Sequence, residues 1–229
     1  MLEFVTKVIL MRKFSTLSAA LALSVAGIVP ASAEMELSIY GGSQSSPHSR
    51  VSGSYPGTGA RYNALIGWEG KSFAPPPYYG ARATWWRRPD LGFGIELTHA
   101  KTYAPDAERR ALGFNRLEFT DGHNIVTFNV MKRWNDRFGS FTPYVGAGIG
   151  LAIPHVDVTS ANGFRSFGYQ VTGPAATVIA GARMPLADQW SVFGEYKGTF
   201  TSNEGDLDTG GVVRTDVVTN AINVGVSFD

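Results

Sequence analysis

The feature that most restricts the fold of this chain is an alternation of apolar with small or polar residues, which recurs in separate runs along the sequence. Eight such runs cover residues 36–45, 78–86, 92–103, 123–134, 141–154, 169–183, 190–201 and 214–228. Successive side chains of a strand point to opposite faces, so each run predicts a strand with one face toward lipid and the other toward a lumen. The sequence therefore predicts an all-β fold, a transmembrane antiparallel up-and-down β-barrel of about eight strands.

Residues 1–33 have the features of a secretory signal peptide. Arg12 and Lys13 are basic, residues 17–29 are apolar or small, and Ala31, Ser32 and Ala33 provide the small side chains of a cleavage site. We expect a mature chain of one outer-membrane barrel domain, residues 34–229, and Met11 is a possible true start. Losing the segment lowers the formal charge of the chain from +1 to −1, which gives no support to a nucleic-acid partner. The chain has no cysteine for a disulfide or a thiolate metal site.

The connections between the runs alternate in length. Residues 87–91, 135–140 and 184–189 are short, whereas 46–77, 104–122, 155–168 and 202–213 are long. In outer-membrane barrels short turns face the periplasm, so the long segments are expected to be extracellular loops. Within the first long segment, apolar and polar residues also alternate over residues 60–73. These residues could extend the second strand or form a separate hairpin. Phe228 resembles the C-terminal aromatic residue that the barrel-assembly machinery recognises, which makes that machinery an expected partner.

The parity of the runs separates a lipid face from a lumen face. The predicted lipid-facing residues are Val126, Phe128, Val130, Ile149, Leu151, Ile153, Ile222, Val224, Val226 and Phe228. The predicted lumen residues are Tyr40, Gln44, Arg82, Glu96, Asn129, Glu195, Lys197 and Asn223. Eight strands leave an interior just wide enough for side chains, so we expect the lumen charges to pair and plug the barrel. Trp85, Trp86, Trp134 and Trp190 are expected to form an aromatic girdle at the end with short turns.

All four histidines fall at the end with long loops, and three of them belong to consecutive strands. Because Asp121 and His123 are two residues apart, they are predicted to share a strand face. Imidazole with carboxylate suits a divalent metal or general acid–base chemistry. His99 and His155 have outward parity, so convergence with His123 requires a bulge or a twist. The predicted catalytic residues are His123, Asp121 and Glu118, and the predicted metal ligands are His99, His123, His155 and Asp121.

Basic residues in the long loops suit contact with anionic lipid headgroups. The predicted substrate-binding residues are Lys71, Lys101 and His48. Surface histidines that bind lipopolysaccharide phosphates, or that bind nothing, are the competing interpretation of the histidine pattern. The sequence has no serine-centred acyl-transfer motif, phosphate loop or nucleotide fingerprint.

An ordered set of segments resembles the outer-membrane lipid A oxidases over nearly the whole mature chain. The segments are 46–49 (SPHS), 67–73 (GWEGKSF), 77–80 (PYYG), 98–101 (THAK), 117–124 (LEFTDGHN), 144–155 (YVGAGIGLAIPH) and 168–174 (GYQVTGP). The resemblance implies an enzyme that uses O2 to oxidise the proximal glucosamine of lipid A to 2-aminogluconate, with lipid A or lipopolysaccharide as partner. Such chemistry usually needs a redox metal or an organic cofactor. The sequence shows no flavin or nicotinamide motif, so a divalent metal is the expected cofactor.

A non-catalytic barrel of the small OmpA-like or OmpW-like kind is the alternative. Such a protein would serve envelope integrity, adhesion or the passage of small apolar molecules. The histidines and acids at the rim favour the enzyme, whereas a plugged lumen and the missing cofactor motif favour the non-catalytic barrel.

Overall fold

The computed structural model describes residues 34–229, so the predicted signal peptide and the alternative start at Met11 lie outside the described residues. The strands are β1 (Glu34–Ser45), β2 (Ser49–Ser54), β3 (Arg61–Ile66), β4 (Tyr79–Arg88), β5 (Leu91–Tyr103), β6 (Phe114–Arg133), β7 (Thr142–Ser160), β8 (Arg165–Tyr169), β9 (Gly173–Ala187), β10 (Trp190–Leu207) and β11 (Gly211–Phe228). Two short helices, α2 (Asp106–Ala111) and η1 (Asp208–Gly210), lie between strands at one end. No helix within residues 34–229 is long and apolar enough to span a membrane.

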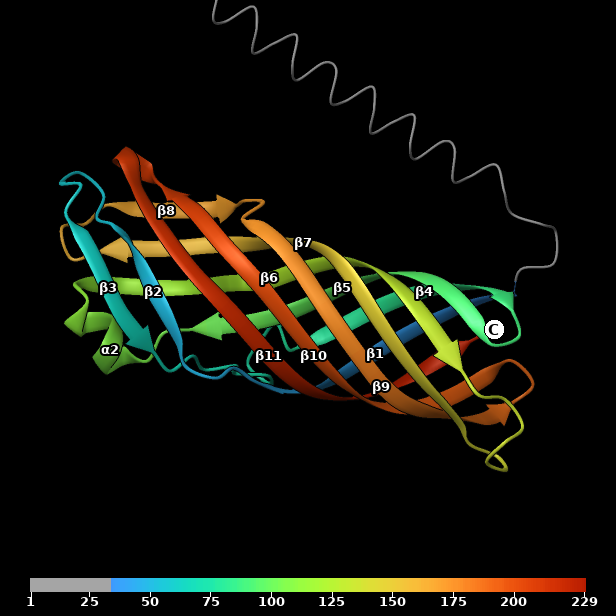
Figure 1. Cartoon of the computed structure of the whole chain (residues 1–229). Helices are drawn as coiled ribbons and strands as arrows, with labels where there is room; N and C mark the ends of the chain where they lie inside the picture. Colours follow the sequence, from blue (N-terminus) through green and yellow to red (C-terminus); the bar gives the residue numbers. More distant parts are fainter. Residues whose placement is uncertain (1–33) are drawn as a thin grey trace, which may run out of the picture. The chain divides into compact units, whose positions relative to one another are not determined.

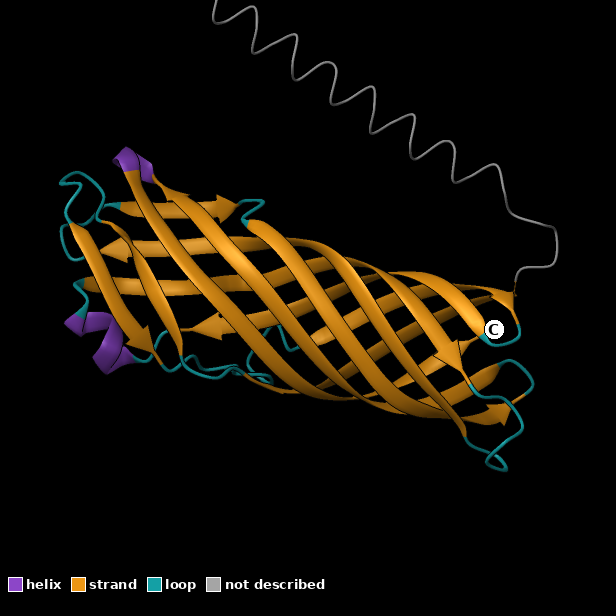
Figure 2. Ribbon diagram, viewed as in Figure 1, coloured by secondary structure: helices purple, strands orange, loops and turns teal. Residues whose placement is uncertain are grey.

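Eight of these strands close an antiparallel barrel in the order β1-β4-β5-β6-β7-β9-β10-β11, with β11 paired again to β1 (Figures 1 and 2). The predicted all-β antiparallel barrel is confirmed. The alternating segment 60–73 contributes β3, which pairs with β2 in a hairpin, and β2 in turn pairs with β11. The separate hairpin is therefore the correct one of the two interpretations of this segment. β8 pairs with β7 at the same end of the barrel.

The side chains alternate between the two faces as the sequence predicts. Phe128, Ile149 and Val224 are among the exposed apolar residues, with 49%, 73% and 68% of their surface accessible. Such a band of exposed apolar residues around the wall is the surface that a bilayer covers. All eight predicted lumen residues are buried. The assignment of the lipid face and the lumen face from parity is thus confirmed.

A network of charged and polar side chains fills the middle of the lumen. Arg82 on β4 binds the carboxylate of Glu195 on β10 at 2.8 Å, and Lys197 binds Glu96 on β5 at 2.9 Å. Tyr40 on β1 donates to Glu96 at 2.7 Å and accepts from Lys197 at 3.0 Å. Further donors to the two carboxylates are Asn129, Tyr144 and Asn223. Because both acids have basic and neutral donors, the charges compensate one another in the interior.

A second polar layer closes the end with short turns. Arg133 pairs with Glu34 at 2.9 Å, and Arg183 pairs with Asp229 at 2.6 Å. The Arg133 guanidinium lies 3.9 Å from the centroid of the Trp86 ring, and Trp86 is only 5% exposed. The prediction that Trp86 belongs to the outer aromatic girdle is therefore wrong, because its side chain faces the lumen and binds a cation there. Its neighbour along the strand, Trp85, has the opposite parity.

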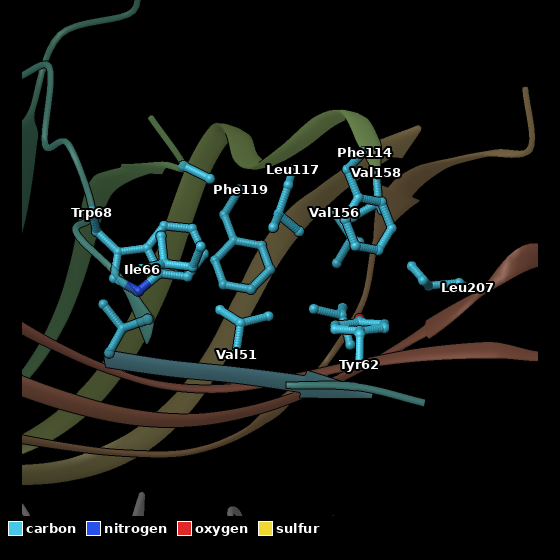
Figure 3. Close-up of a cluster of buried hydrophobic side chains, with 13 residues drawn as sticks. Val51, Tyr62, Ile66, Trp68, Phe114, Leu117, Phe119, Val156, Val158 and Leu207 are labelled. Atoms are coloured by element: carbon cyan, nitrogen blue, oxygen red, sulfur yellow. The ribbon is translucent and has the colours of Figure 1, made fainter. Parts of the chain in front are cut away.

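An apolar cluster fills the lumen at the other end (Figure 3). Figure 3 shows Trp68 and Phe119 at one side of it and Phe114, Val158 and Leu207 at the other. The cluster exists because strands continue through much of the predicted loops 104–122, 155–168 and 202–213, so that β6, β7, β10 and β11 are 18 to 20 residues long. A barrel strand needs only about 9 to 11 residues to cross a bilayer. The additional residues of these four strands form the part of the barrel at the end with long strands, called the outer half below, which has its own apolar core.

Replacing Glu195 with leucine tests the mid-lumen network. Arg82 would lose its closest acidic partner inside the barrel, and removing one member of a buried pair costs about 3 to 5 kcal/mol. We expect the free energy of unfolding in lipid vesicles, followed by urea titration and the heat-modifiable gel band, to fall by this order. Glu204→Leu breaks an exposed pair with Arg214 and is the matched control, for which we expect little change. Equal midpoints for the two variants would contradict a stabilising network.

Candidate functional site

The predicted site residues lie where the apolar belt of the wall gives way to polar residues. On β5, His99 follows the exposed residues Ile95 and Leu97 on the outward face. Its ring stacks on Tyr79 of β4 at 4.9 Å, and a 2.9 Å hydrogen bond joins its Nδ1 to Oδ1 of Asn124. His99 is only 5% exposed because these neighbours cover it. The residue faces outward, as its parity predicts.

A bulge in β6 separates the two residues that were expected to share a face. Asp121 and Gly122 have φ of 44° and 105°, and the pairing of β6 with β7 shifts between Thr120 and His123. Asp121 is exposed on the outer surface, whereas His123 is completely buried in the lumen, 5.2 Å from the ring of Phe119. The prediction that Asp121 and His123 lie on one face is therefore wrong. A side chain sealed in the lumen cannot reach a lipid headgroup.

His155 occupies the outward face of β7. It pairs across the strands with Tyr169 of β8, and its ring lies edge-on to Phe167 at 4.2 Å and to Tyr169 at 4.7 Å. Both aromatic rings are more than half exposed, whereas His155 is 5% exposed. The histidine therefore acts as packing beneath two aromatic side chains at the boundary of the apolar belt.

An ion-pair cluster that the sequence analysis missed surrounds Glu118. Asp157, opposite Glu118 on β7, has no exposed surface and accepts from Arg116 at 2.7 Å and from Arg165 at 3.4 Å. Its hydrogen bond raises the pKa of Arg116. Glu118 itself lies 3.4 Å from Arg116. Residues 155–159 alternate like the rest of β7, which is the sequence signal for a strand here, although the segment 155–168 is predicted to be a loop.

The three predicted substrate-binding residues differ in access. Lys101 is completely buried on the outward side of β5, and its Nζ donates to the carbonyl of Ala74 at 2.8 Å. It therefore holds the segment 67–78 against the barrel. Lys71 is exposed and pairs with Glu69 at 3.2 Å. His48 is exposed in the connection before β2 and lies against Gly67.

The structure brings His99 and Asp121 to the same outer surface and leaves His123 inside the barrel. Within residues 34–229 no group of three or more histidine, aspartate or glutamate side chains is placed to hold a metal ion. The four predicted ligands do not fit a divalent metal as a set, because the barrel wall separates His123 from His99 and His155. The predicted catalytic set of His123, Asp121 and Glu118 is divided in the same way.

Comparison with known proteins identifies the fold. No family model and no curated protein matches the sequence. Neisserial surface protein A is a structural neighbour with a TM-score of 0.50 and 16% identity, over 86% of this chain and 97% of that one. The outer membrane protein OprG from Pseudomonas aeruginosa matches with a TM-score of 0.53 and 14% identity, over 86% and 96% of the two chains. The chain therefore has the fold of a small outer-membrane β-barrel, and the likeness does not single out lipid A oxidases.

Lys101→Met tests whether this lysine fixes the segment 67–78. Methionine keeps much of the volume of the side chain but cannot donate to the Ala74 carbonyl, so the segment should open more often. Loss of a hydrogen bond from a charged donor is expected to raise amide hydrogen exchange in residues 67–78 about tenfold. Lys71→Met removes a charge from the segment itself and is the control, with little expected change. Equal exchange in both variants would show that Lys101 does not fix the segment.

Proposed function

We propose that this chain is a non-catalytic outer-membrane barrel that supports envelope integrity and displays its outer half at the cell surface. The observation that carries the proposal is the filled lumen. Two polar layers and the apolar cluster follow one another from the end with short turns to the end with long strands. Each layer joins strands that are far apart in the sequence and so ties the wall together.

The same layers argue against passage through the barrel. A water-soluble molecule would have to displace Arg82, Glu96, Glu195 and Lys197, all of which are at least 96% buried. Separating such buried partners is costly. A small apolar molecule would have to displace packed side chains such as Phe114 and Val156, which are at most 1% exposed. Support of the envelope and surface display therefore fit the interior better than transport does.

The proposal predicts a barrel without a channel. Mature protein refolded in planar bilayers should give no stable conductance, with a general porin as the positive control. A strain that lacks the protein should leak more periplasmic enzyme, and expression of the chain should reverse the leak. Glu195→Leu should restore the envelope less well in proportion to its loss of folded protein. Stable conductance from folded protein, or a deletion strain with an intact envelope, would overturn the proposal.

Lipid A oxidation is a second candidate, in accordance with the sequence resemblance. The observation that favours it is the outward position of His99 and Asp121 at the edge of the apolar belt, the level of the lipid headgroups. Lipid A from cells with and without the protein should then differ by the mass of one oxygen. His99→Ala should abolish the gain and His123→Ala should not, because His123 lies in the lumen. Lipid A of unchanged mass in expressing cells would remove this candidate.

A further inference from the structure

An apolar groove crosses the lipid-facing wall over β7, β9 and β10, the strands at the front of Figure 1. Ala176 on β9 lies in register between Ile149 on β7 and Phe200 on β10. The short side chain between two long ones leaves a groove of about 580 Å³, which extends along Leu151 and Pro174. The groove is open to the bilayer and has the width of a single side-chain row, which suits an acyl chain.

The groove ends where the outer surface becomes polar. Toward the end with long strands, the next outward residue beyond Phe200 on β10 is Ser202. On β11, which runs in the opposite direction, the next outward residue beyond Val218 is Asp216. A polar pocket of about 480 Å³ lies here over β10, β11 and β2, and Pro174 lines both the pocket and the groove. A molecule with an apolar chain and a polar head could occupy both without a break.

Two arginines give this pocket its basic groups. Arg214 is held by Glu204 through hydrogen bonds of 2.7 and 2.9 Å, so this pair is neutral. Arg50 donates Nη1 to Asn63 at 2.9 Å, and no carboxylate of residues 34–229 forms an ion pair with it. Asp216 also lines the pocket and opposes this charge. Arg50 is thus the guanidinium with free donors for an anionic group.

A second pocket of about 710 Å³ continues from the first through Ser52 and Arg214. Its lining includes Ser54, Asn63 and Arg61, and Arg61 has no ion pair in the described part of the chain. Hydroxyl and amide groups suit the hydroxyls of a sugar, and a second free guanidinium suits a second anionic group. The two pockets together provide more room than the single phosphate of a phospholipid head needs.

We infer that this wall binds one acylated, phosphate-bearing saccharolipid of the outer leaflet, with an acyl chain in the groove beside Ala176 and a phosphate at Arg50. The inference deepens the proposed function, since a lipid fixed on the wall would couple the barrel to the leaflet around it. It places the lipid on β7, β9, β10, β11 and β2, and no histidine of the described residues lines the groove or the two pockets.

Native mass spectrometry of the folded mature protein with added lipid A tests the site. Arg50→Gln should weaken lipid A binding about tenfold, the order expected for one charge-assisted contact. Asp216→Asn should strengthen it, because it removes the opposing charge. Arg110→Gln, on α2, is the charge control and should bind as the unchanged protein does.

A larger side chain at position 176 tests whether the groove holds the acyl chain. Ala176→Phe should fill it and weaken binding, whereas Ala180→Phe, which faces lipid on the same strand near the short turns, should not. The heat-modifiable gel band verifies folding of every variant. Binding that Arg50→Gln and Ala176→Phe leave unchanged, or phosphatidylglycerol binding as tight as that of lipid A, would overturn the inference. The lipid-binding assay does not depend on the conductance or envelope experiments. A failure of the proposed function can therefore be distinguished from a failure of this inference.

Discussion

The ion pairs that join β4, β5 and β10 inside the lumen are the interaction on which the rest of the barrel depends. Arg82, Glu96, Glu195 and Lys197 would each face hydrocarbon if their strands shifted by one residue. A basic residue at the middle of a bilayer costs about 2 to 4 kcal/mol. The need to pair these charges therefore selects one register, and that register determines which side chains meet lipid.

Because paired charges fill the lumen, any ligand or partner has to bind on the outer wall or on the outer half of the barrel. The outer half is stable because β6, β7, β10 and β11 continue beyond the membrane and enclose an apolar core. The β2 and β3 hairpin extends the sheet at β11 and covers an edge that would otherwise have unpaired backbone groups. The side chains that fill the lumen thus also support an extended surface at the end with long strands.

The sequence predicted the faces of the strands well and their local irregularities poorly. Alternation identified the lumen residues because it needs only a period of two. It failed at Asp121, which a bulge of left-handed backbone at Asp121 and Gly122 places on the outer surface, because a bulge leaves no mark in the pattern of polarity. It places Lys101 correctly on the outward face of its strand but does not show that the segment 67–78 covers this side chain. The contact between Lys101 and Ala74 joins two parts of the chain whose proximity cannot be predicted from the sequence.

The proposed lipid site could not be predicted from the sequence for the same reason, because it depends on contacts between distant parts of the chain. Ala176, Ile149 and Phe200 each obey the alternation, and only their pairing across three strands turns a difference in size into a groove. Arg50 and Arg214 are distant in sequence and become neighbours because β2 pairs with β11. Binding sites on a barrel wall arise from cross-strand pairs of unequal size or unbalanced charge. They become visible only when the register is known, and in this chain the buried ion pairs set that register.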